Sequence, residues 1–313
     1  MIDLHMHTTY SDGTYSVTQI LQEAERQGLK YISITDHDRC LAYKELKEID
    51  IKKYYSGKII SGIEIKCAYK GRLIEVLGYN YDTEKMQKWI NEYYKDKQRD
   101  VIQTKYFNIL YDACMKLQLK LDAKEKIKWN PNNDWASFTI YNEIKKYEEN
   151  KEKLPQDLWE DFTTFTKKYC GDLNSVFHID KSNDYPTLDV AIKAIKDCGG
   201  KALMAHIFIY KWAINKEELI QDIMKNYDID GFECYYTKFT PEQIEYIVNL
   251  CKTNNLLMSG GSDFHGENKP DIKLGVGKGN LQVSEQIIQN WNIWNLNRKE
   301  NIDEHIWKRS GTI

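Results

Sequence analysis

The sequence predicts an α/β fold built on a mainly parallel sheet, with a helical segment inserted in its middle. In the first and last thirds of the 313 residues, short apolar runs alternate with helical patterns, which is typical of βαβ units. Between about residues 83 and 185 the alternation gives way to long polar helical patterns rich in Lys, Glu, Tyr and Trp. We therefore expect residues 1–82 and 186–285 to form the sheet-containing domain, and 83–185 to form an inserted helical subdomain.

In the first third, each predicted element has its own start or stop signal. A strand over Ile2–His7 precedes a helix that begins at the capping box Ser16-Val17-Thr18-Gln19 and ends near Gly28. The remaining apolar runs predict strands, of which the last two are joined by the turn Lys70-Gly71: Tyr31–Thr35, Ile59–Ile65 and Leu73–Tyr79.

The last third repeats this pattern. A helix over Thr187–Asp197 ends at Gly199-Gly200, and a second helix opens at the capping box Thr240-Pro241-Glu242-Gln243. The strands predicted around these helices are Lys201–Ala205, Asp230–Tyr236 and Leu256–Ser259. Beyond them, residues 286–313 form a C-terminal extension whose Trp291, Trp294 and Trp307 are expected to pack on the sheet-containing domain.

Composition restricts the class of protein. The chain has 44 Lys and Arg against 47 Asp and Glu, a formal charge of −3, and 42% apolar residues. These values are typical of a globular protein and argue against one whose main task is to neutralise a long phosphate backbone. We therefore expect no long nucleic acid as a partner.

Cysteine usage and the N-terminus predict a compartment. The seven cysteines are scattered and include no CxxC pair, which favours reduced thiols over a disulfide framework. The N-terminus has neither a basic segment nor an apolar signal region, and no run approaches the ~20 apolar residues of a membrane span. The sequence predicts a cytoplasmic protein without a membrane partner.

Side chains that bind metal ions gather where the predicted strands end. His5 and His7 are two residues apart, so both side chains project from the same face of an extended strand. Functional loops gather at the carboxyl edge of a parallel sheet, because all its strands end there. We therefore expect five imidazoles and at least three carboxylates to meet at one edge: His5, His7, His37, His206 and His265, with Asp12, Glu64 and Asp263.

Each of these fragments has an ordinary explanation when taken alone. A lone His-x-His is more often incidental than a ligand pair, Asp12-Gly13 alone would be a turn, and Glu64 alone would be a buried ion-pair partner. Together they supply imidazole and carboxylate, the ligand set of zinc, manganese and iron. Eight ligands exceed the need of one ion, so we predict two or three divalent ions that share a bridging carboxylate. His178 and His305 follow no strand and are expected to be ordinary histidines.

The same fragments resemble a known family. The matching segments are Asp3–Gly13, Ile34–Asp38, Gly62–Ile65, Leu203–His206 and Ser259–Gly266. In this order the chain resembles the PHP (polymerase and histidinol phosphatase) family, and most of all its stand-alone bacterial phosphoesterases, which also carry a helical insertion after the first strands. The segment Asn268–Gly275 is similar to the tail of that subgroup.

The resemblance implies a distorted (β/α)7 TIM-like barrel, with the helical insertion as a substrate lid and the extension packed on the barrel. It also implies three sets of metal ligands. The first set is His5, His7, Glu64 and Asp263, and the second is Asp12, His37 and His265. The third is Glu64 and His206 with one more ligand, so Glu64 would bridge the first and third ions.

Three departures from the family pattern stand out. Glu75 occupies the place where the family usually has a histidine that completes the third set, and a carboxylate there favours harder ions such as manganese. Ile207 stands where a proline is common. Arginines that grip phosphate in related insertions are scarce near Trp135–Tyr141.

The resemblance and the ligand set together predict a metal-dependent phosphoesterase, in which a metal-bridging hydroxide attacks phosphorus. Asp36 is expected to orient its neighbour His37, and Lys211 is either a phosphate contact or an ordinary surface charge. The expected substrate is a small phosphorylated metabolite: a nucleotide, nucleoside bisphosphate, sugar phosphate or cyclic phosphate. The alternatives are an exonuclease on short oligonucleotides, an amidohydrolase-type C–N hydrolase, and a metal domain without catalysis.

Overall fold

The computed structural model of the chain describes residues 1–291, and these form two compact units. The sheet unit contains Met1–Cys67, Ile74–Ile90 and the described residues from Thr187 onward. The helical unit contains Ala68–Leu73 and Asn91–Pro186. Each unit is built around its own set of buried apolar side chains.

The strands lie close to the ranges that the sequence predicts. In chain order they are β1 (Ile2–Met6), β2 (Tyr31–Ile34), β3 (Lys58–Ile59), β4 (Gly62–Tyr69), β5 (Arg72–Tyr79), β6 (Lys201–Met204), β7 (Gly231–Tyr236) and β8 (Leu257–Gly261). One sheet has the order β1-β2-β3, and the other has the order β4-β5-β6-β7-β8. Neighbouring strands are parallel in the pairs β1-β2, β2-β3, β6-β7 and β7-β8, whereas β5 and β6 are antiparallel.

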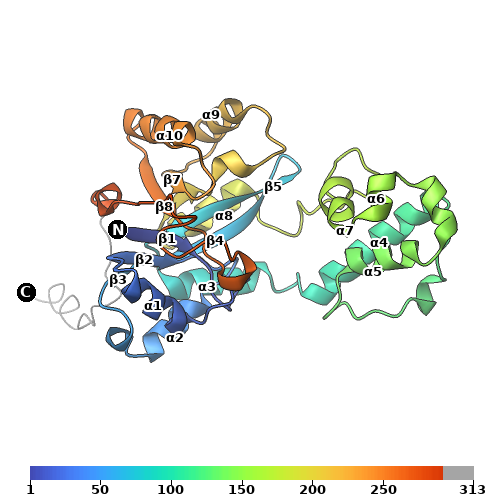
Figure 1. The fold of residues 1–313 in the computed structure, drawn as a ribbon, viewed down its shortest axis with the longest axis horizontal. Helices are drawn as coiled ribbons and strands as arrows, with labels where there is room; N and C mark the ends of the chain where they lie inside the picture. Colours follow the sequence, from blue (N-terminus) through green and yellow to red (C-terminus); the bar gives the residue numbers. More distant parts are fainter. Residues whose placement is uncertain (292–313) are drawn as a thin grey trace, which may run out of the picture. The chain divides into compact units, whose positions relative to one another are not determined.

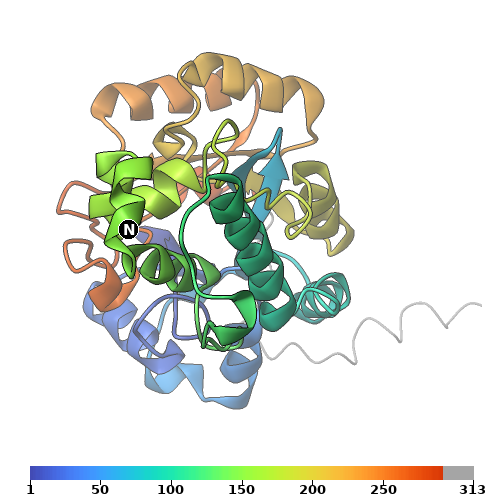
Figure 2. The ribbon, with the colours of Figure 1, turned by 90° about the vertical axis from the view of Figure 1, so that its right-hand side faces the viewer.

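These elements confirm the mixed α/β class. The strand pairings of the described residues make two sheets, and the finer prediction of a closed (β/α)7 barrel stays a prediction. In the sheet unit the helices are α1 (Val17–Arg26), α2 (Leu41–Glu48), α3 (Thr83–Tyr93), α8 (Leu188–Asp197), α9 (Lys216–Asn226) and α10 (Pro241–Thr253). Helices α1 and α2 lie on one side of the strands of this unit, and α9 and α10 lie on the other (Figure 1 and Figure 2).

The two capping boxes form as the sequence predicts. The Ser16 hydroxyl accepts a hydrogen bond from the Gln19 backbone N–H, and the Gln19 side chain accepts one from the Ser16 backbone N–H. Thr240 and Gln243 make the same reciprocal pair at the start of α10. Each box satisfies backbone donors that have no partner within the helix, which fixes where the helix begins.

The apolar run Ile59–Ile65, predicted as one strand, is divided between two sheets. β3 ends at Ile59 and β4 begins at Gly62, where a Cβ atom would lie only 2.0 Å from the Ser33 Oγ atom. A continuous apolar run does not reveal such a change of sheet. The predicted turn Lys70-Gly71 is confirmed, and both of its residues have positive φ angles, 47° and 74°, as the tight turn of a hairpin requires.

The core of the sheet unit joins the first strand to the last of the described residues. Ile2 and Leu4 of β1 are fully buried together with Tyr79, Leu203 and Trp291. The Trp291 ring lies 5.1 Å from the Tyr79 ring and packs in this core, whereas the packing of the whole extension stays a prediction. Trp294, Trp307 and His305 lie outside the described residues.

The helical unit is a small bundle with an aromatic core. Its helices are α4 (Arg99–Lys116), α5 (Ala136–Lys145), α6 (Gln156–Glu160) and α7 (Phe162–Thr164). Phe107 of α4 is buried and stacks on Trp129, with ring centroids 4.5 Å apart. Among the described residues of the chain, no helix combines the length and the apolar character that crossing a membrane requires.

Gly261 of β8 lies directly against His5 of β1. A Cβ atom there would lie 2.4 Å from the His5 backbone nitrogen, which is a forbidden approach to backbone. We predict that Gly261→Ala lowers the free energy of unfolding by about 1–3 kcal/mol, the usual cost of overpacking a tight interior. Urea unfolding monitored by circular dichroism measures it, and an unchanged free energy would show that the two strands are not held this closely.

Candidate metal centre

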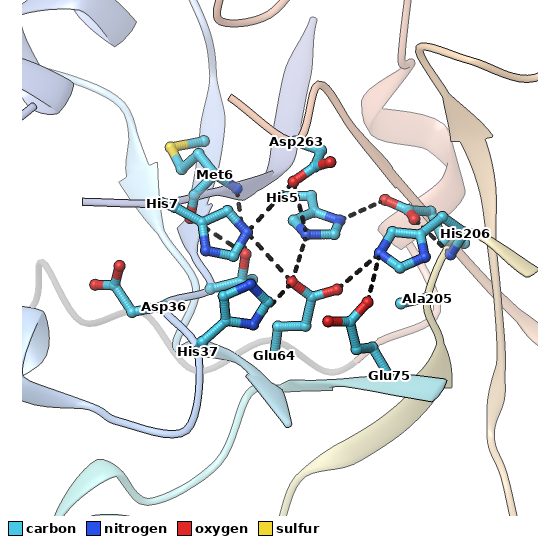
Figure 3. Close-up of polar contacts among 12 residues, drawn as sticks. His5, Met6, His7, Asp36, His37, Glu64, Glu75, Ala205, His206 and Asp263 are labelled. Carbon is cyan, nitrogen blue, oxygen red and sulfur yellow. Dashed lines mark hydrogen bonds and ion pairs between the residues drawn. The ribbon is translucent and has the colours of Figure 1, made fainter. Parts of the chain in front are cut away.

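Segments from six strands bring the predicted ligands together at one site. His5 lies in β1, Glu64 in β4 and Glu75 in β5. His7 and Asp12 follow β1, and the other ligands follow the ends of β2, β6 and β8. Figure 3 shows the side chains of His5, His7, His37, Glu64, Glu75, His206 and Asp263 directed toward one another. Residues separated by more than 250 positions therefore meet, as the sequence predicts.

The Glu64 carboxylate lies at the centre of the cluster and is almost fully buried. Its Oε2 atom is 3.2 Å from Nε2 of His5, 3.3 Å from Nε2 of His7 and 3.4 Å from Nδ1 of His37. Its Oε1 atom is 2.9 Å from Nε2 of His206. One carboxylate thus contacts four imidazoles, as the prediction of a bridging carboxylate requires.

A second group forms around Asp12 in the loop after β1. Its Oδ1 atom is 3.3 Å from Nε2 of His265 and 3.5 Å from Nδ1 of His7, and its Oδ2 atom is 3.6 Å from Nε2 of His37. The Asp12 side chain is 52% exposed, whereas His265 and His7 are buried. This group is therefore the part of the cluster that solvent reaches.

Potential ligand atoms form three groups, and within each group all the atoms lie within 4.8 Å of one another. The membership of these groups differs in detail from the implied sets. His7 belongs to two groups, and His37 rather than His206 joins Glu64 and Glu75 in the third. Asp263 lies beside the first group, with Oδ1 3.6 Å from Nε2 of His5 and 3.4 Å from Nε2 of His7. The groups are His7, Asp12, His37 and His265, then His5, His7 and Glu64, then His37, Glu64 and Glu75.

Electrostatics in the cluster favour bound positive charge. Burial lowers the pKa of His5, but the charges of Glu64 and Glu233 outweigh burial and raise this pKa well above its usual value. Burial also lowers the pKa of His7, but the Asp263 and Glu64 carboxylates stabilise the protonated ring and raise this pKa to about 9. Protons on these rings balance the buried carboxylates, and divalent ions would replace those protons.

The donor set fits divalent cations. The buried atoms Nε2 of His7 and Nδ1 of His37 face Glu64 but have no hydrogen-bond partner. Buried polar atoms are rarely left without a partner unless a ligand completes them. Imidazole nitrogens and carboxylate oxygens at this density are the ligands that zinc, manganese and iron take.

Glu75 lies at the edge of the cluster, where the third set lacked a ligand. Its Oε2 atom is 3.4 Å from Nε2 of His206. Burial, and then the charge of Glu64, raise the pKa of Glu75 to about 7. The charge of Glu64 thus disfavours the ionised form of Glu75, and a cation shared by the two carboxylates would stabilise that form.

If Glu75 is a ligand, Glu75→His will change which ion the third group prefers. An imidazole adds no negative charge, so we expect weaker binding of manganese relative to zinc. Competition between the two ions, followed by elemental analysis, measures this preference. Identical occupancy and preference in the variant would remove Glu75 from the ligand set.

Asp36 does not contact the His37 ring. Its carboxylate accepts hydrogen bonds from the backbone N–H and hydroxyl of Thr8, at 2.7 Å each, and from the Ser11 hydroxyl at 2.6 Å. Figure 3 shows the Asp36 carboxylate directed away from His37. Asp36 points away from His37 because adjacent residues on an extended chain point in opposite directions. Through its hydrogen bonds to Thr8 and Ser11, it instead holds the loop that carries Asp12.

Two other residues singled out in the sequence lie apart from the three groups. Lys211 is exposed in the loop before α9. His178 is half-buried in the helical unit. Neither contributes an atom to the groups of potential metal ligands.

Sequence reasoning missed three residues that contact the cluster. Glu233 of β7 is fully buried, and its Oε1 atom is 2.8 Å from Nδ1 of His5. The Tyr236 hydroxyl and the Lys269 ammonium group both donate to Oδ2 of Asp263, at 2.8 Å and 2.6 Å. Glu233 carried the same signal as Glu64, a carboxylate inside an apolar strand, whereas Tyr236 and Lys269 carried none.

Comparison with known proteins decides the family. The PHP domain model matches residues 3–169, which is more than half of the chain. The chain belongs to the PHP domain family. This PHP protein is 28% identical to a 5'-3' exoribonuclease of Haemophilus influenzae over 92% of this chain and 97% of that protein. It is 22% identical to a phosphoribosyl 1,2-cyclic phosphate 1,2-diphosphodiesterase of Eggerthella lenta, over 85% and 94% respectively.

Solved structures agree on the fold. A candidate metal-dependent phosphoesterase from Bifidobacterium adolescentis matches this PHP protein with a TM-score of 0.60 and 20% identity, over 92% of this chain and 93% of that chain. An amidohydrolase from Chromobacterium violaceum matches with a TM-score of 0.59 and 19% identity, over 91% and 92%. The names of the curated relatives confirm the predicted class, a hydrolase that acts on phosphoester bonds.

The expectation that no long nucleic acid is a partner is wrong. The Haemophilus relative and a relative from Escherichia coli, 24% identical over 93% of both chains, are both named 5'-3' exoribonucleases. A net charge of −3 sums the whole chain and does not report the charge around one site. Metal ions at an active site also neutralise phosphate, and no sequence count includes them.

Proposed function

We propose that this PHP protein is a metal-dependent phosphodiesterase that hydrolyses RNA from its 5′ end. The observation that carries the metal dependence is the set of three groups of potential ligands, two of which share Glu64. The relatives named 5'-3' exoribonucleases support the substrate, because they match almost the full length of this chain. When bound, divalent ions neutralise phosphoryl oxygens and lower the pKa of water toward neutrality.

The proposed ligand sets are those that the family resemblance implies, and the short distances around Glu64 and Asp12 support them. His5, His7, Glu64 and Asp263 would hold one ion, and Asp12, His37 and His265 would hold a second. Glu64, Glu75 and His206 would hold a third, with His37 close enough to take part. Manganese, iron and zinc all suit this set of nitrogen and oxygen ligands.

The chain's own residues prepare the site for an anionic substrate. Lys269 balances one carboxylate oxygen of Asp263 and leaves the other facing His5 and His7. Asp36 fixes the loop of Thr8 and Ser11, so that Asp12 is held at the exposed side of the cluster. A phosphodiester would therefore enter beside Asp12.

We also propose that the two sheets close into the distorted (β/α)7 TIM-like barrel. Backbone hydrogen bonds between segments of different sheets support closure on both sides. The His7 N–H donates to the Phe264 carbonyl at 2.9 Å, and the Asp38 N–H donates to the Glu64 carbonyl at 3.0 Å. In this proposal 1–82 and 186–285 form the barrel, and a lid role for 83–185 stays a prediction.

Hydrolysis assays on two kinds of substrate test the function. We expect the protein with added Mn²⁺ to shorten a 5′-phosphorylated single-stranded RNA from its 5′ end, which paired labels at the two ends report. His7→Ala, purified identically, controls for contaminating nucleases and is expected to be inactive. RNA left intact while phosphate or a C–N product is released from other substrates would contradict the proposal.

A small phosphorylated metabolite is the second candidate substrate. The Eggerthella relative, named a cyclic phosphate diphosphodiesterase, favours it. The same assay includes nucleoside bisphosphates and cyclic sugar phosphates. A specificity constant higher for one of these than for RNA would assign the protein to this second class.

A further inference from the structure

Glu233 connects two histidines that come from distant parts of the chain. It lies in β7 with its side chain fully buried. One carboxylate oxygen, Oε1, is 2.8 Å from Nδ1 of His5 in β1. The other, Oε2, accepts a hydrogen bond of 2.8 Å from the backbone N–H of His206, after β6.

The contact with His5 selects one state of its ring. A carboxylate only accepts hydrogen bonds, so the proton of a neutral His5 ring must be on Nδ1. The other nitrogen, Nε2, is then free of a proton and faces Glu64 at 3.2 Å and Asp263 at 3.6 Å. Only a nitrogen without a proton ligates a metal ion.

The contact with His206 supports a strained backbone. His206 has a φ angle of 26°, which residues other than glycine rarely adopt. Such strain persists only where surrounding contacts hold it, and it concentrates at functional sites. The strained conformation brings Nε2 of His206 to 2.9 Å from Oε1 of Glu64.

We propose that Glu233 is a positioning residue that prepares His5 and His206 together for metal binding. The proposal rests on the ligand set of the proposed function, but not on the identity of the substrate. A carboxylate that accepts from a metal-binding histidine fixes its tautomer and raises its basicity. Here one carboxylate would act on ligands of two different ions, and so couple their binding.

A nearby carboxylate provides a matched control. Asp230 precedes β7 and accepts a hydrogen bond of 2.8 Å from the backbone N–H of Ala202 in β6. It thus bridges the same two strands as Glu233, but at their other end and without a histidine. Asp230→Asn reports what the loss of a charge between β6 and β7 does to the fold alone.

Glu233→Gln is the test variant. Glutamine keeps the size of the side chain, but one of its two terminal atoms is an amide nitrogen that donates and cannot accept. It can therefore serve either His5 with its proton on Nδ1 or the His206 N–H, and not both. We expect the Kd for Zn²⁺ to rise roughly 10- to 100-fold, the usual cost of losing such a partner.

The measurements are a Zn²⁺ titration against a chromophoric chelator and a ¹⁵N spectrum of the histidine rings in the Zn²⁺-loaded protein. In the wild type we expect the His5 proton on Nδ1, and in Glu233→Gln a fraction of His5 with its proton on Nε2. Asp230→Asn is expected to match the wild type in both. The wild-type spectrum shows which nitrogen of His5 carries the proton even if Glu233→Gln does not fold.

Three results would overturn the inference. They are a wild-type His5 proton on Nε2, an unchanged Kd in Glu233→Gln, and an equal rise of Kd in Asp230→Asn. If the wild type binds Zn²⁺ with the expected spectrum and hydrolyses no phosphoester, the proposed function fails and the role of Glu233 stands. If it hydrolyses RNA and Glu233→Gln binds Zn²⁺ normally, only the role of Glu233 fails.

Discussion

Glu64→Gln will remove phosphoester hydrolysis, with a rate loss on the order of 10³-fold or more. Glu64 contacts four imidazoles and belongs to two of the three groups of potential ligands. Glutamine keeps its shape but withdraws the negative charge that would bridge the ions. Loss of the several kcal/mol that bound ions contribute to the transition state corresponds to a factor of this size.

Elemental analysis and steady-state kinetics of the folded variant measure the effect. Glu143→Gln is the matched control, since Glu143 is also buried but accepts its hydrogen bond from the Asp122 backbone N–H in the helical unit. We expect this control to keep its metal content and activity. A Glu64→Gln protein with full metal content and wild-type turnover would exclude Glu64 as the bridging ligand.

Removing divalent ions with a chelator will abolish hydrolysis and lower the melting temperature. Without cations, the buried carboxylates of Glu64 and Asp263 and the half-buried carboxylate of Glu75 face one another across the cluster. An ion that binds only the folded protein stabilises it by mass action, and its removal withdraws that stabilisation. Adding back Mn²⁺, Fe²⁺ or Zn²⁺ should restore both properties, and the most effective ion identifies the preferred metal.

The control for this experiment is the same chelator saturated beforehand with the restoring ion, which should change neither activity nor melting temperature. Metal content is measured on every sample. Full hydrolysis by protein shown to be free of metal would contradict the metal-dependent mechanism.

Much of the site could be predicted because its signals are local. His5 and His7 share a face through their spacing alone, and Glu64 is conspicuous as a carboxylate in an apolar run. Capping residues such as Ser16 and Thr240 mark where helices begin. Strand ends located in this way were enough to predict that these histidine and carboxylate side chains lie together, which is how the structure has them.

The errors arose where neighbours in space are not neighbours in sequence. Asp36 adjoins His37 along the chain, but its partners are Thr8 and Ser11, more than twenty residues away. Glu233 was overlooked because nothing in β7 itself indicates that His5 lies beside it. The prediction that net charge excludes a long nucleic acid failed for a related reason. A sum over the chain contains no information on where charges meet a substrate.

Anomalous X-ray diffraction from crystals grown with Mn²⁺ or Zn²⁺ tests the central claim most directly. The account predicts two or three anomalous peaks around Glu64, each about 2.0–2.2 Å from nitrogen or oxygen atoms of the proposed ligands. His5 and His7 should contact a peak together with Asp263. An absence of peaks at this cluster, or peaks bound only elsewhere on the protein, would contradict the account.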